Sequence, residues 1–334
     1  MKDRFEAVDA VVRDACGTAF TAAVARIERG GALCFERAYG VTRADAEGRP
    51  VFLDTRFDLA SLTKLFVATL VLRAVAEKRL GLDEIVVPPS ITARMLLAHD
   101  SGMNSGADYR LLLDHNVETF ALEEPLVATP GERVIYSDLG FIVIGVLLER
   151  LDGCALSSIV ERFFARPTLG FRPAAAERRS IPATEDDGWR GRVQGSVHDE
   201  KAHLMGGVAG HAGLFGTAAD VAALTEGYLG SLCGRDRALL PDALVREAVS
   251  EQAYDPVLRR GLGWALKTND ANSCGRFFSS TSFGHTGFVG TCVWADPERD
   301  LQGVLLTNSV YFGRNDIRDL RAAFYEAAAE ATAR

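Results

Sequence analysis

The sequence lacks a long hydrophobic run. Hydrophobic residues make up 48% of its 334 positions, but no stretch reaches the roughly 18 consecutive apolar residues of a membrane-spanning helix. The apolar segments around Leu65 and Phe141 stop well short of this length. Residues 1–10 carry charged side chains where a secretory signal needs an uninterrupted apolar stretch. We therefore expect a soluble cytoplasmic protein with no membrane partner.

Cysteine is sparse and scattered. No C-x-x-C pair and no cluster with the spacing of a zinc site occurs, so the sequence predicts reduced thiols and no bound metal or cofactor. The six cysteines are Cys16, Cys34, Cys154, Cys233, Cys274 and Cys292.

Blocks of basic residues and several common enzyme motifs are also absent. The formal charge is −8 at pH 7, which argues against a nucleic-acid partner, because phosphates attract basic surfaces. No serine lies in G-x-S-x-G, which excludes an α/β-hydrolase, and no H-E-x-x-H, G-x-G-x-x-G or Walker lysine occurs. The length allows one large domain or two closely packed ones.

Ser61-Leu62-Thr63-Lys64 is the only place where a serine precedes a lysine by three residues, and it opens an apolar run that extends to Leu72. If the run is a helix, Ser61 and Lys64 share one face. An amine in an apolar wall loses its preference for the charged form and can help to remove a serine proton. The alternative is that Ser61 is only the N-cap of the helix.

Two further motifs favour the catalytic interpretation. Tyr136-Ser137-Asp138 precedes a second apolar helix pattern, 75 residues after Ser61, and His285-Thr286-Gly287 precedes a strand pattern, 224 residues after it. Each is the only match of its kind in the sequence.

In this order the three motifs resemble those of the penicillin-recognising serine hydrolases: serine β-lactamases, D,D-peptidases and related esterases, whose signature is S-x-x-K, Y-x-N or S-x-N, and K-T-G or H-T-G. The spacing is similar to that of the class-C-like branch. Further stretches that fit this branch are residues 96–103, 129–132, 212–220 and 261–264.

The resemblance implies roles for the motif residues. Ser61 is the nucleophile, Lys64 and Tyr136 together are the base, and the oxyanion hole uses the backbone N–H groups of Ser61 and Phe288. The residues expected to bind the substrate are Asp138, His285, Thr286 and Gly287. Tyr136 has a structural alternative, a buried aromatic ring at a helix entrance.

Asp138 and His285 depart from the common pattern. An ionised Asp138 only accepts hydrogen bonds, whereas the usual Asn can donate to a substrate carbonyl. It is expected to pair with Lys64 or, alternatively, to cap the following helix. His285 replaces the lysine of many β-lactamases and, being largely neutral, holds a carboxylate less firmly. It could instead be a satisfied core residue.

A histidine cluster lies near a glycine-rich segment, residues 206–213. The spacing of His198, His203 and His211 matches no zinc motif, so we expect a loop that packs near the mouth of the site and predict no metal there.

Strand patterns occur at both ends of the sequence and helical patterns between them. The segments with helical character are 5–14, 91–99, 117–126, 138–150 and 316–331. The β-rich segments are 20–28, 32–38, 263–267, 277–283, 291–295 and 303–308.

These patterns predict an α/β (α+β) fold in which helices flank one antiparallel sheet with an inserted all-α region. The sheet region is expected to comprise residues 1–60 and 250–334, and the mainly helical region residues 61–249. The resemblance implies the same β-lactamase/transpeptidase-like fold, with the active site between the two regions.

The sequence therefore predicts a serine hydrolase that acts through an acyl-enzyme on a small-molecule ester or amide. The cell-wall enzymes of this family work outside the cytoplasm, so the absence of an export signal favours a small-molecule substrate. The alternatives are an acyltransferase, a β-lactamase or D,D-peptidase, and a non-catalytic binding module. The sequence does not predict the oligomeric state.

Overall fold

A seven-stranded antiparallel sheet forms the centre of the computed structural model, which describes residues 4–235 and 239–333. The strand order is β10-β11-β12-β13-β14-β1-β2, so strands from the two ends of the chain pair in the middle, where β1 lies beside β14. These strands are β1 (Ala22–Arg29), β2 (Ala32–Gly40), β10 (Arg259–Arg260), β11 (Ala265–Leu266), β12 (Phe283–Thr286), β13 (Cys292–Asp296) and β14 (Leu301–Thr307).

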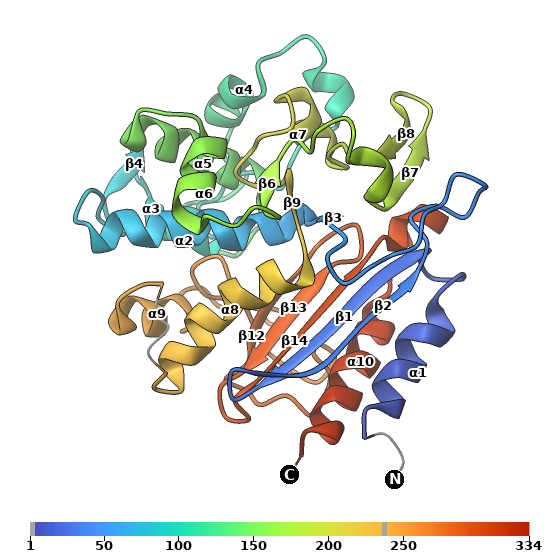
Figure 1. Cartoon of the computed structure of the whole chain (residues 1–334). Helices are drawn as coiled ribbons and strands as arrows, with labels where there is room; N and C mark the ends of the chain where they lie inside the picture. The colour runs from blue at the N-terminus through green and yellow to red at the C-terminus, as the bar shows by residue number, and fades with distance from the viewer. Residues whose placement is uncertain (1–3, 236–238, 334) are drawn as a thin grey trace.

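Helices cover both faces of this sheet (Figure 1). The terminal helices α1 (Glu6–Ala15) and α10 (Arg318–Ala331) pack on one face, and α8 (Ala218–Leu232) packs on the other. Alternate residues of β1 belong to the two resulting cores, Val24 on the side of α8 and Ala25 on the side of α1 and α10. Apolar residues therefore occur on both faces of β1 and make up five of its eight positions, Ala22–Ala25 and Ile27.

A mainly helical layer lies above α8 in Figure 1, with α2 (Thr63–Ala76) passing through it. Because α2 is apolar on almost every side and surrounded by other elements, it is a core helix rather than a surface one. The remaining helices are α3 (Ala93–Ala98), α4 (Val117–Glu123), α5 (Asp138–Asp152), α6 (Leu156–Phe164), α7 (Glu200–Leu204) and α9 (Asp242–Ala248).

Short strands connect this layer to the central sheet. The three-stranded sheet β3-β9-β6 joins the segment before Ser61 to the segment after residue 213. Its strands are β3 (Phe57–Asp58), β9 (Leu214–Gly216) and β6 (Gly170–Phe171), and the other short pairs are β4 (Ile85–Val87) with β5 (Ile91–Thr92) and β7 (Ala183–Asp187) with β8 (Gly191–Gln194).

The predicted mixed α/β fold with an antiparallel sheet flanked by helices is confirmed. The expected region boundaries, 1–60 with 250–334 and 61–249, stay a prediction; α8, which falls within 61–249, packs against the sheet.

One expected strand is wrong. Segment 277–283 is largely irregular, and β12 begins only at Phe283. His285 and Thr286 end β12 and precede the next strand, β13, close to the segment 291–295 expected from the sequence. Side chains bond the backbone of this segment: Asp296 accepts from Ser279 N–H at 2.7 Å, and Lys267 Nζ donates to the Phe278 carbonyl at 2.6 Å. Such side-chain bonds compete with a strand ladder.

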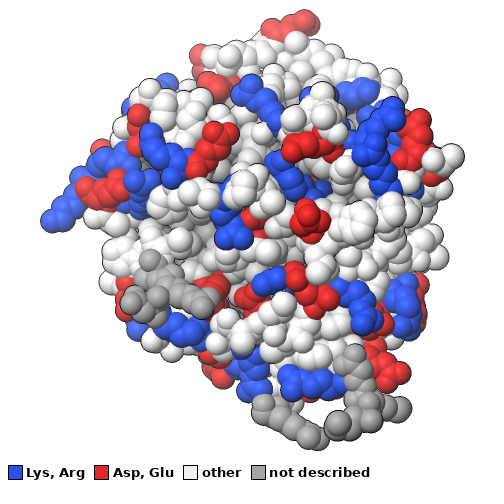
Figure 2. Space-filling model, viewed as in Figure 1, with Lys and Arg blue, Asp and Glu red and all other residues white. Residues whose placement is uncertain are grey.

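All six cysteines are free thiols. In the part of the chain that the structure describes, no helix combines the length and the apolarity that crossing a bilayer requires. On the face shown in Figure 2, acidic and basic side chains are interspersed rather than separated into large areas of one sign.

Candidate active site

Ser61 lies between β3 and α2, in a short 3-10 turn formed by Ala60–Leu62. Its Oγ is 3.0 Å from Lys64 Nζ. The N-cap position of α2 belongs to Leu62, so the interpretation of Ser61 as the N-cap is wrong. Ala60 has φ +46°, a left-handed conformation that costs energy for a residue with a Cβ, and Asp58 Oδ1 accepts from its N–H at 2.8 Å. A buried carboxylate thus supports the turn that presents Ser61.

Lys64 is fully buried and each of its three N–H bonds meets an acceptor. The ammonium donates to Ser61 Oγ, to Asp138 Oδ1 at 2.8 Å and to the carbonyl of His211 at 3.2 Å. Burial lowers the pKa of Lys64, but the charge of Asp138 and the hydroxyl of Tyr136 outweigh burial and raise the pKa above its ordinary value. Lys64 is therefore an ammonium in the resting site.

The Tyr136 ring lies against three polar side chains. Its centroid is 4.8 Å from Lys64 Nζ, 4.5 Å from the His99 ring and 6.0 Å from the His285 ring. His99 Nδ1 accepts a hydrogen bond from the Ser137 N–H at 3.1 Å, so His99 holds both the ring and the backbone of this segment. Burial keeps the pKa of His99 well below its ordinary value. Sequence patterns alone indicate no role for His99, although it lies in one of the stretches that fit the family.

Asp138 is the first residue of α5, and Ser137 is the N-cap: its side chain accepts from the Gly140 N–H at 3.0 Å. The interpretation of Asp138 as the cap is therefore wrong. Its two oxygens contact two lysines instead, Lys64 at 2.8 Å and Lys201 at 3.2 Å. Burial raises the pKa of Asp138, but the positive charges around it, Lys64 first, lower it overall.

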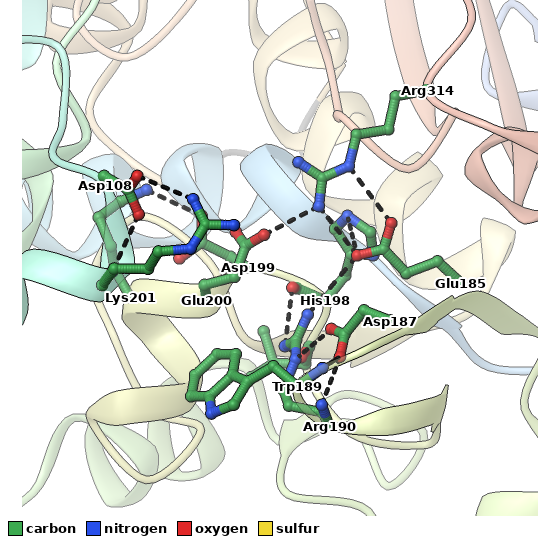
Figure 3. A network of polar contacts seen from close by, with 12 residues as sticks. Asp108, Glu185, Asp187, Trp189, Arg190, His198, Asp199, Glu200, Lys201 and Arg314 are labelled. Carbon is green, nitrogen blue, oxygen red and sulfur yellow. Dashed lines mark hydrogen bonds and ion pairs between the residues drawn. The ribbon is translucent and has the colours of Figure 1, made fainter. Parts of the chain in front are cut away.

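Lys201, Asp199 and His211 complete a polar network that sequence reasoning missed. Asp199 Oδ2 is 3.2 Å from Lys201 Nζ, and Asp199 Oδ1 is 2.7 Å from His211 Nε2. The histidine cluster and the adjoining glycine-rich segment were the only sequence signal, and they indicated a loop near the site without indicating its contacts. Figure 3 draws Asp199 and Lys201 together with a second group of contacts, in which Arg314 pairs with Glu185 and Glu200.

Asp138, Asp199 and His211 also form a group whose ligand atoms lie within 4.8 Å of one another. Both carboxylates already contact the ammonium groups of Lys64 and Lys201. A metal ion here would have to displace these ammonium groups, so the donor set fits a lysine pair better than a metal.

The H-T-G segment forms the opposite wall. His285 is buried, its Nδ1 donates to the Thr286 carbonyl at 2.8 Å, and its Nε2 has no hydrogen-bond partner among the described residues. It is thus not a satisfied core histidine. Burial, with the charges of Lys64 and Arg260, lowers the pKa of His285 to about 3. The ring is therefore neutral near pH 7, as expected.

Gly287 allows this wall to approach the nucleophile. A Cβ on Gly287 would lie 2.1 Å from Thr291 Oγ1 and 2.9 Å from the Leu59 carbonyl, so only glycine fits. Within the described residues, neither the Ser61 nor the Phe288 backbone N–H donates to another backbone group. Both donors are therefore available to an oxyanion.

A cavity of about 570 Å³ lies in front of Ser61. Its walls include Ser61, Tyr136, His285, Thr286, Gly287 and Phe288. The cavity also contains Arg260 from β10, which sequence reasoning missed because nothing in its local pattern distinguishes it from a surface arginine. Its guanidinium carbon lies 5.2 Å from the Tyr136 ring centroid, and it forms no ion pair within the described residues.

Comparison with known proteins shows the family to which the chain belongs. The Beta-lactamase family model matches residues 8–328. The chain is 30% identical, over 90% of its own length and 80% of the relative's, to the N-acetylmuramyl-L-alanine amidase of Bacillus subtilis (strain 168). It is 28% identical, over 76% and 69% of the two lengths, to a putative D-alanyl-D-alanine carboxypeptidase of Escherichia coli (strain K12).

Among solved structures, EstCE1, a hydrolase with promiscuous acyltransferase activity, matches with a TM-score of 0.76 at 21% identity, covering 96% of this chain and 98% of that chain. The fold is thus β-lactamase/transpeptidase-like. The chain belongs to the Beta-lactamase family of serine hydrolases.

Proposed function

We propose that this protein hydrolyses an ester or a small amide through an acyl-enzyme on Ser61. The observation that carries the proposal is the contact of Ser61 Oγ with Lys64 Nζ at 3.0 Å, at the wall of a cavity that Tyr136 also lines. A serine hydroxyl is a weak nucleophile until a neighbouring group takes its proton.

Lys64 and Tyr136 act together as the base. As Oγ attacks the substrate carbonyl carbon, the pair takes the hydroxyl proton and then delivers it to the leaving oxygen or nitrogen. Water attacks the resulting acyl-enzyme, the pair takes a proton from that water, and the acid leaves while Ser61 recovers its hydrogen. Because Lys64 is an ammonium at rest, the pair acts as the base only after it has lost one proton to the solvent. The Tyr136 oxygen then accepts the Ser61 proton while the neighbouring Lys64 stabilises the negative charge on that oxygen.

The backbone N–H groups of Ser61 and Phe288 hold the negative oxygen of the tetrahedral intermediate. Donors that are fixed before the reaction stabilise developing charge without reorganisation, and removal of one such donor typically costs on the order of a hundredfold in rate. Their lack of backbone partners within the described residues supports this role.

Covalent labelling tests the proposal. A fluorophosphonate should label Ser61 alone, as mapped by mass spectrometry of the digested protein, and p-nitrophenyl acetate should be turned over. Ser61→Ala should lose both activities and keep its melting temperature, because it loses one oxygen and no helix cap. Ser158→Ala, an exposed serine on α6, is the matched control and should behave as the wild type. A label on another serine would overturn the assignment, and the absence of any label would favour a non-catalytic binding module.

Arg260 favours a second candidate, an amidase or peptidase whose substrate carries a carboxylate. A buried guanidinium without an ion pair is costly, and an anion in the cavity would offset that cost. The names of the Bacillus and Escherichia relatives also refer to amide hydrolysis. Against this, Asp138 offers no donor to a substrate amide and His285 is uncharged.

We expect the ester to be the better substrate. kcat/KM for p-nitrophenyl butyrate should exceed that for nitrocefin, which carries both an amide and a carboxylate. Arg260→Gln should lower kcat/KM for nitrocefin further and leave the ester value nearly unchanged. A nitrocefin value equal to or above the ester value would establish the second candidate and show that the carboxylate at position 138 does not hinder amide recognition.

A further inference from the structure

A closed ring of polar contacts lies behind the nucleophile. Lys64 bonds Asp138, Asp138 bonds Lys201, Lys201 bonds Asp199, and Asp199 bonds the His211 ring. The carbonyl of the same His211 accepts from Lys64, which closes the ring. The ring joins α2, α5 and a third part of the chain that contains both the start of α7 and, twelve residues from Asp199, His211 before β9.

We propose, on the basis of the proposed function, that Lys201 is a positioning residue: its ammonium holds the second oxygen of Asp138 and limits the charge that this carboxylate exerts on Lys64. Lys201 does not line the cavity and does not reach Ser61, so it acts through Asp138.

The geometry of Lys201 suits this task. Its side chain is 11% exposed, and Nζ lies at 3.2 Å from both Asp138 Oδ2 and Asp199 Oδ2. Asp199 is in turn fixed as the N-cap of α7, where it accepts from the Ala202 N–H at 2.8 Å. The lysine is therefore held between two carboxylates and has little freedom to turn elsewhere.

The charges in the ring balance as two pairs. Two ammonium groups, Lys64 and Lys201, face two carboxylates, Asp138 and Asp199. Without Lys201, two carboxylates would face a single lysine, and the full charge of Asp138 would act on Lys64. An opposite charge at this distance favours the protonated amine. Lys64 would then yield a proton only at higher pH.

Other titratable groups also face the ring, and none replaces Lys201. Tyr136 contacts Lys64 on the cavity side. His99 and His285 are affected by the charge of Lys64, and burial keeps the pKa of each below its ordinary value, so both are neutral near pH 7. Burial raises the pKa of Asp58 to about 6, and the charge of Asp199 adds to this.

The carboxylate of Asp138 also accounts for the presence of a second lysine, Lys201, behind the site. The Y-x-N pattern places a neutral amide at position 138, which needs no second cation. An aspartate at this position brings a negative charge whose side chain is only 19% exposed, and a charge so far removed from water needs a partner. Lys201 supplies the compensating charge, which lets the site keep a carboxylate beside Lys64.

The test is the pH dependence of Ser61 labelling by a fluorophosphonate, measured together with kcat/KM for p-nitrophenyl butyrate. In Lys201→Met the acidic limb should move up by about one pH unit, a roughly tenfold loss of rate at pH values below the limb. Lys201→Arg should restore the wild-type limb. In an Asp138→Asn background, the change Lys201→Met should move the limb much less, because the carboxylate that Lys201 compensates is gone.

Lys267→Met is the matched control. Lys267 is likewise buried, but it donates to the carbonyls of Arg276 and Phe278 rather than to the ring. Its loss should lower the melting temperature and leave the pH profile unchanged.

The other possible results would each overturn the proposed role of Lys201. A Lys201→Met protein with a lower melting temperature and an unmoved limb would make Lys201 purely structural, and equal shifts in both backgrounds would show that it does not act through Asp138. If Lys201→Met does not fold, Lys201→Gln is measured in the same way, and a wild-type limb there overturns the inference. A wild-type protein that takes no label overturns the proposed function and the inference with it, whereas a labelled protein with an unmoved limb overturns the inference alone.

Discussion

Lys64 occupies an environment in which few lysines are found. It has no exposed surface, and its ammonium is stabilised by a carboxylate, a hydroxyl and a carbonyl. Replacing the carboxylate by an amide of the same shape isolates the effect of charge, since the geometry of the site is retained. The Asp138→Asn substitution is therefore the most direct probe at the scale of single residues.

Asp138→Asn should move the acidic limb of kcat/KM against pH downward. Removal of a negative charge beside an ammonium lowers the pKa of Lys64, and Lys201, which remains, acts in the same direction. The shift should be about one pH unit, the size expected for the loss of one close charge.

The profile is measured with p-nitrophenyl butyrate for both proteins. Asp83→Asn, which loses a solvent-exposed pair with Arg94, serves as the control and should leave the limb in place. An upward shift in Asp138→Asn would contradict the pairing with Lys64. An unmoved limb with a lower melting temperature would make Asp138 a structural residue of α5.

At the scale of elements, the turn between β12 and β13 forms the wall of the site that faces Ser61. Gly287 follows β12 and faces the segment before Ser61 so closely that no Cβ fits. Its N–H donates to the Thr291 carbonyl at 2.7 Å, and its carbonyl accepts from Arg321 at 3.0 Å. The turn that carries the Phe288 N–H is therefore fixed on several sides.

Gly287→Ala should displace this turn and separate the two oxyanion donors. We expect the labelling rate of Ser61 to fall by at least tenfold, with a loss of about 1–3 kcal/mol in the free energy of unfolding from overpacking. Gly188→Ala is the control, because its Cβ would meet no atom within 4 Å. Stopped-flow labelling and urea unfolding measure the two effects. Wild-type labelling by Gly287→Ala would show that the turn can shift without cost and that the close approach is not required.

At the scale of the whole molecule, the site depends on pairing between the two ends of the chain. β1 lies between β2 and β14, so the sheet that carries His285 is complete only when the C-terminal strands pair with the N-terminal hairpin. The buried ring of His285 thus becomes neutral as a consequence of global folding, which links the site to the pH dependence of stability.

His285 should make the fold less stable in acid. Its pKa is about 3 in the folded protein, below the ordinary 6.5. The stability that this group contributes is present above pH 6.5 and is lost as the pH falls toward 3, at roughly 1.4 kcal/mol per pH unit. Burial raises the pKa values of Asp58 and Asp100 to about 6, which gives slopes of the opposite sign, so the effect must be read as a difference between two proteins.

The difference is that between the wild type and His285→Gln. The free energy of unfolding is measured with urea at a series of pH values. Relative to the wild type, that of the variant should increase by roughly 1.4 kcal/mol per pH unit as the pH falls from 6.5 toward 3. Two parallel stability curves would mean that His285 takes up a proton as readily in the folded protein as in the unfolded one.

The sequence by itself determined the fold class and the motif residues of the site. The spacing of Ser61 and Lys64 depends on one helical turn, and the apolar periods of α2, α5 and α10 are each contained in a single window. Information of this kind is local, because side chains a few positions apart have fixed relative directions once the backbone is regular. The three motifs and their order also gave the family.

The tertiary structure alone decided which partners these residues meet. Lys201 and Asp199 lie more than 60 residues from the nearest motif residue, Asp138, and Arg260 has no local pattern that distinguishes it. Their contacts with the site depend on how α7 and β10 pack. Local caps were also misassigned, since both Ser61 and Asp138 suit an N-cap by residue type, yet Leu62 and Ser137 hold those positions. A polar side chain near a helix start satisfies whichever partner packing brings closest, and here the closest partner of both residues is the buried ammonium of Lys64.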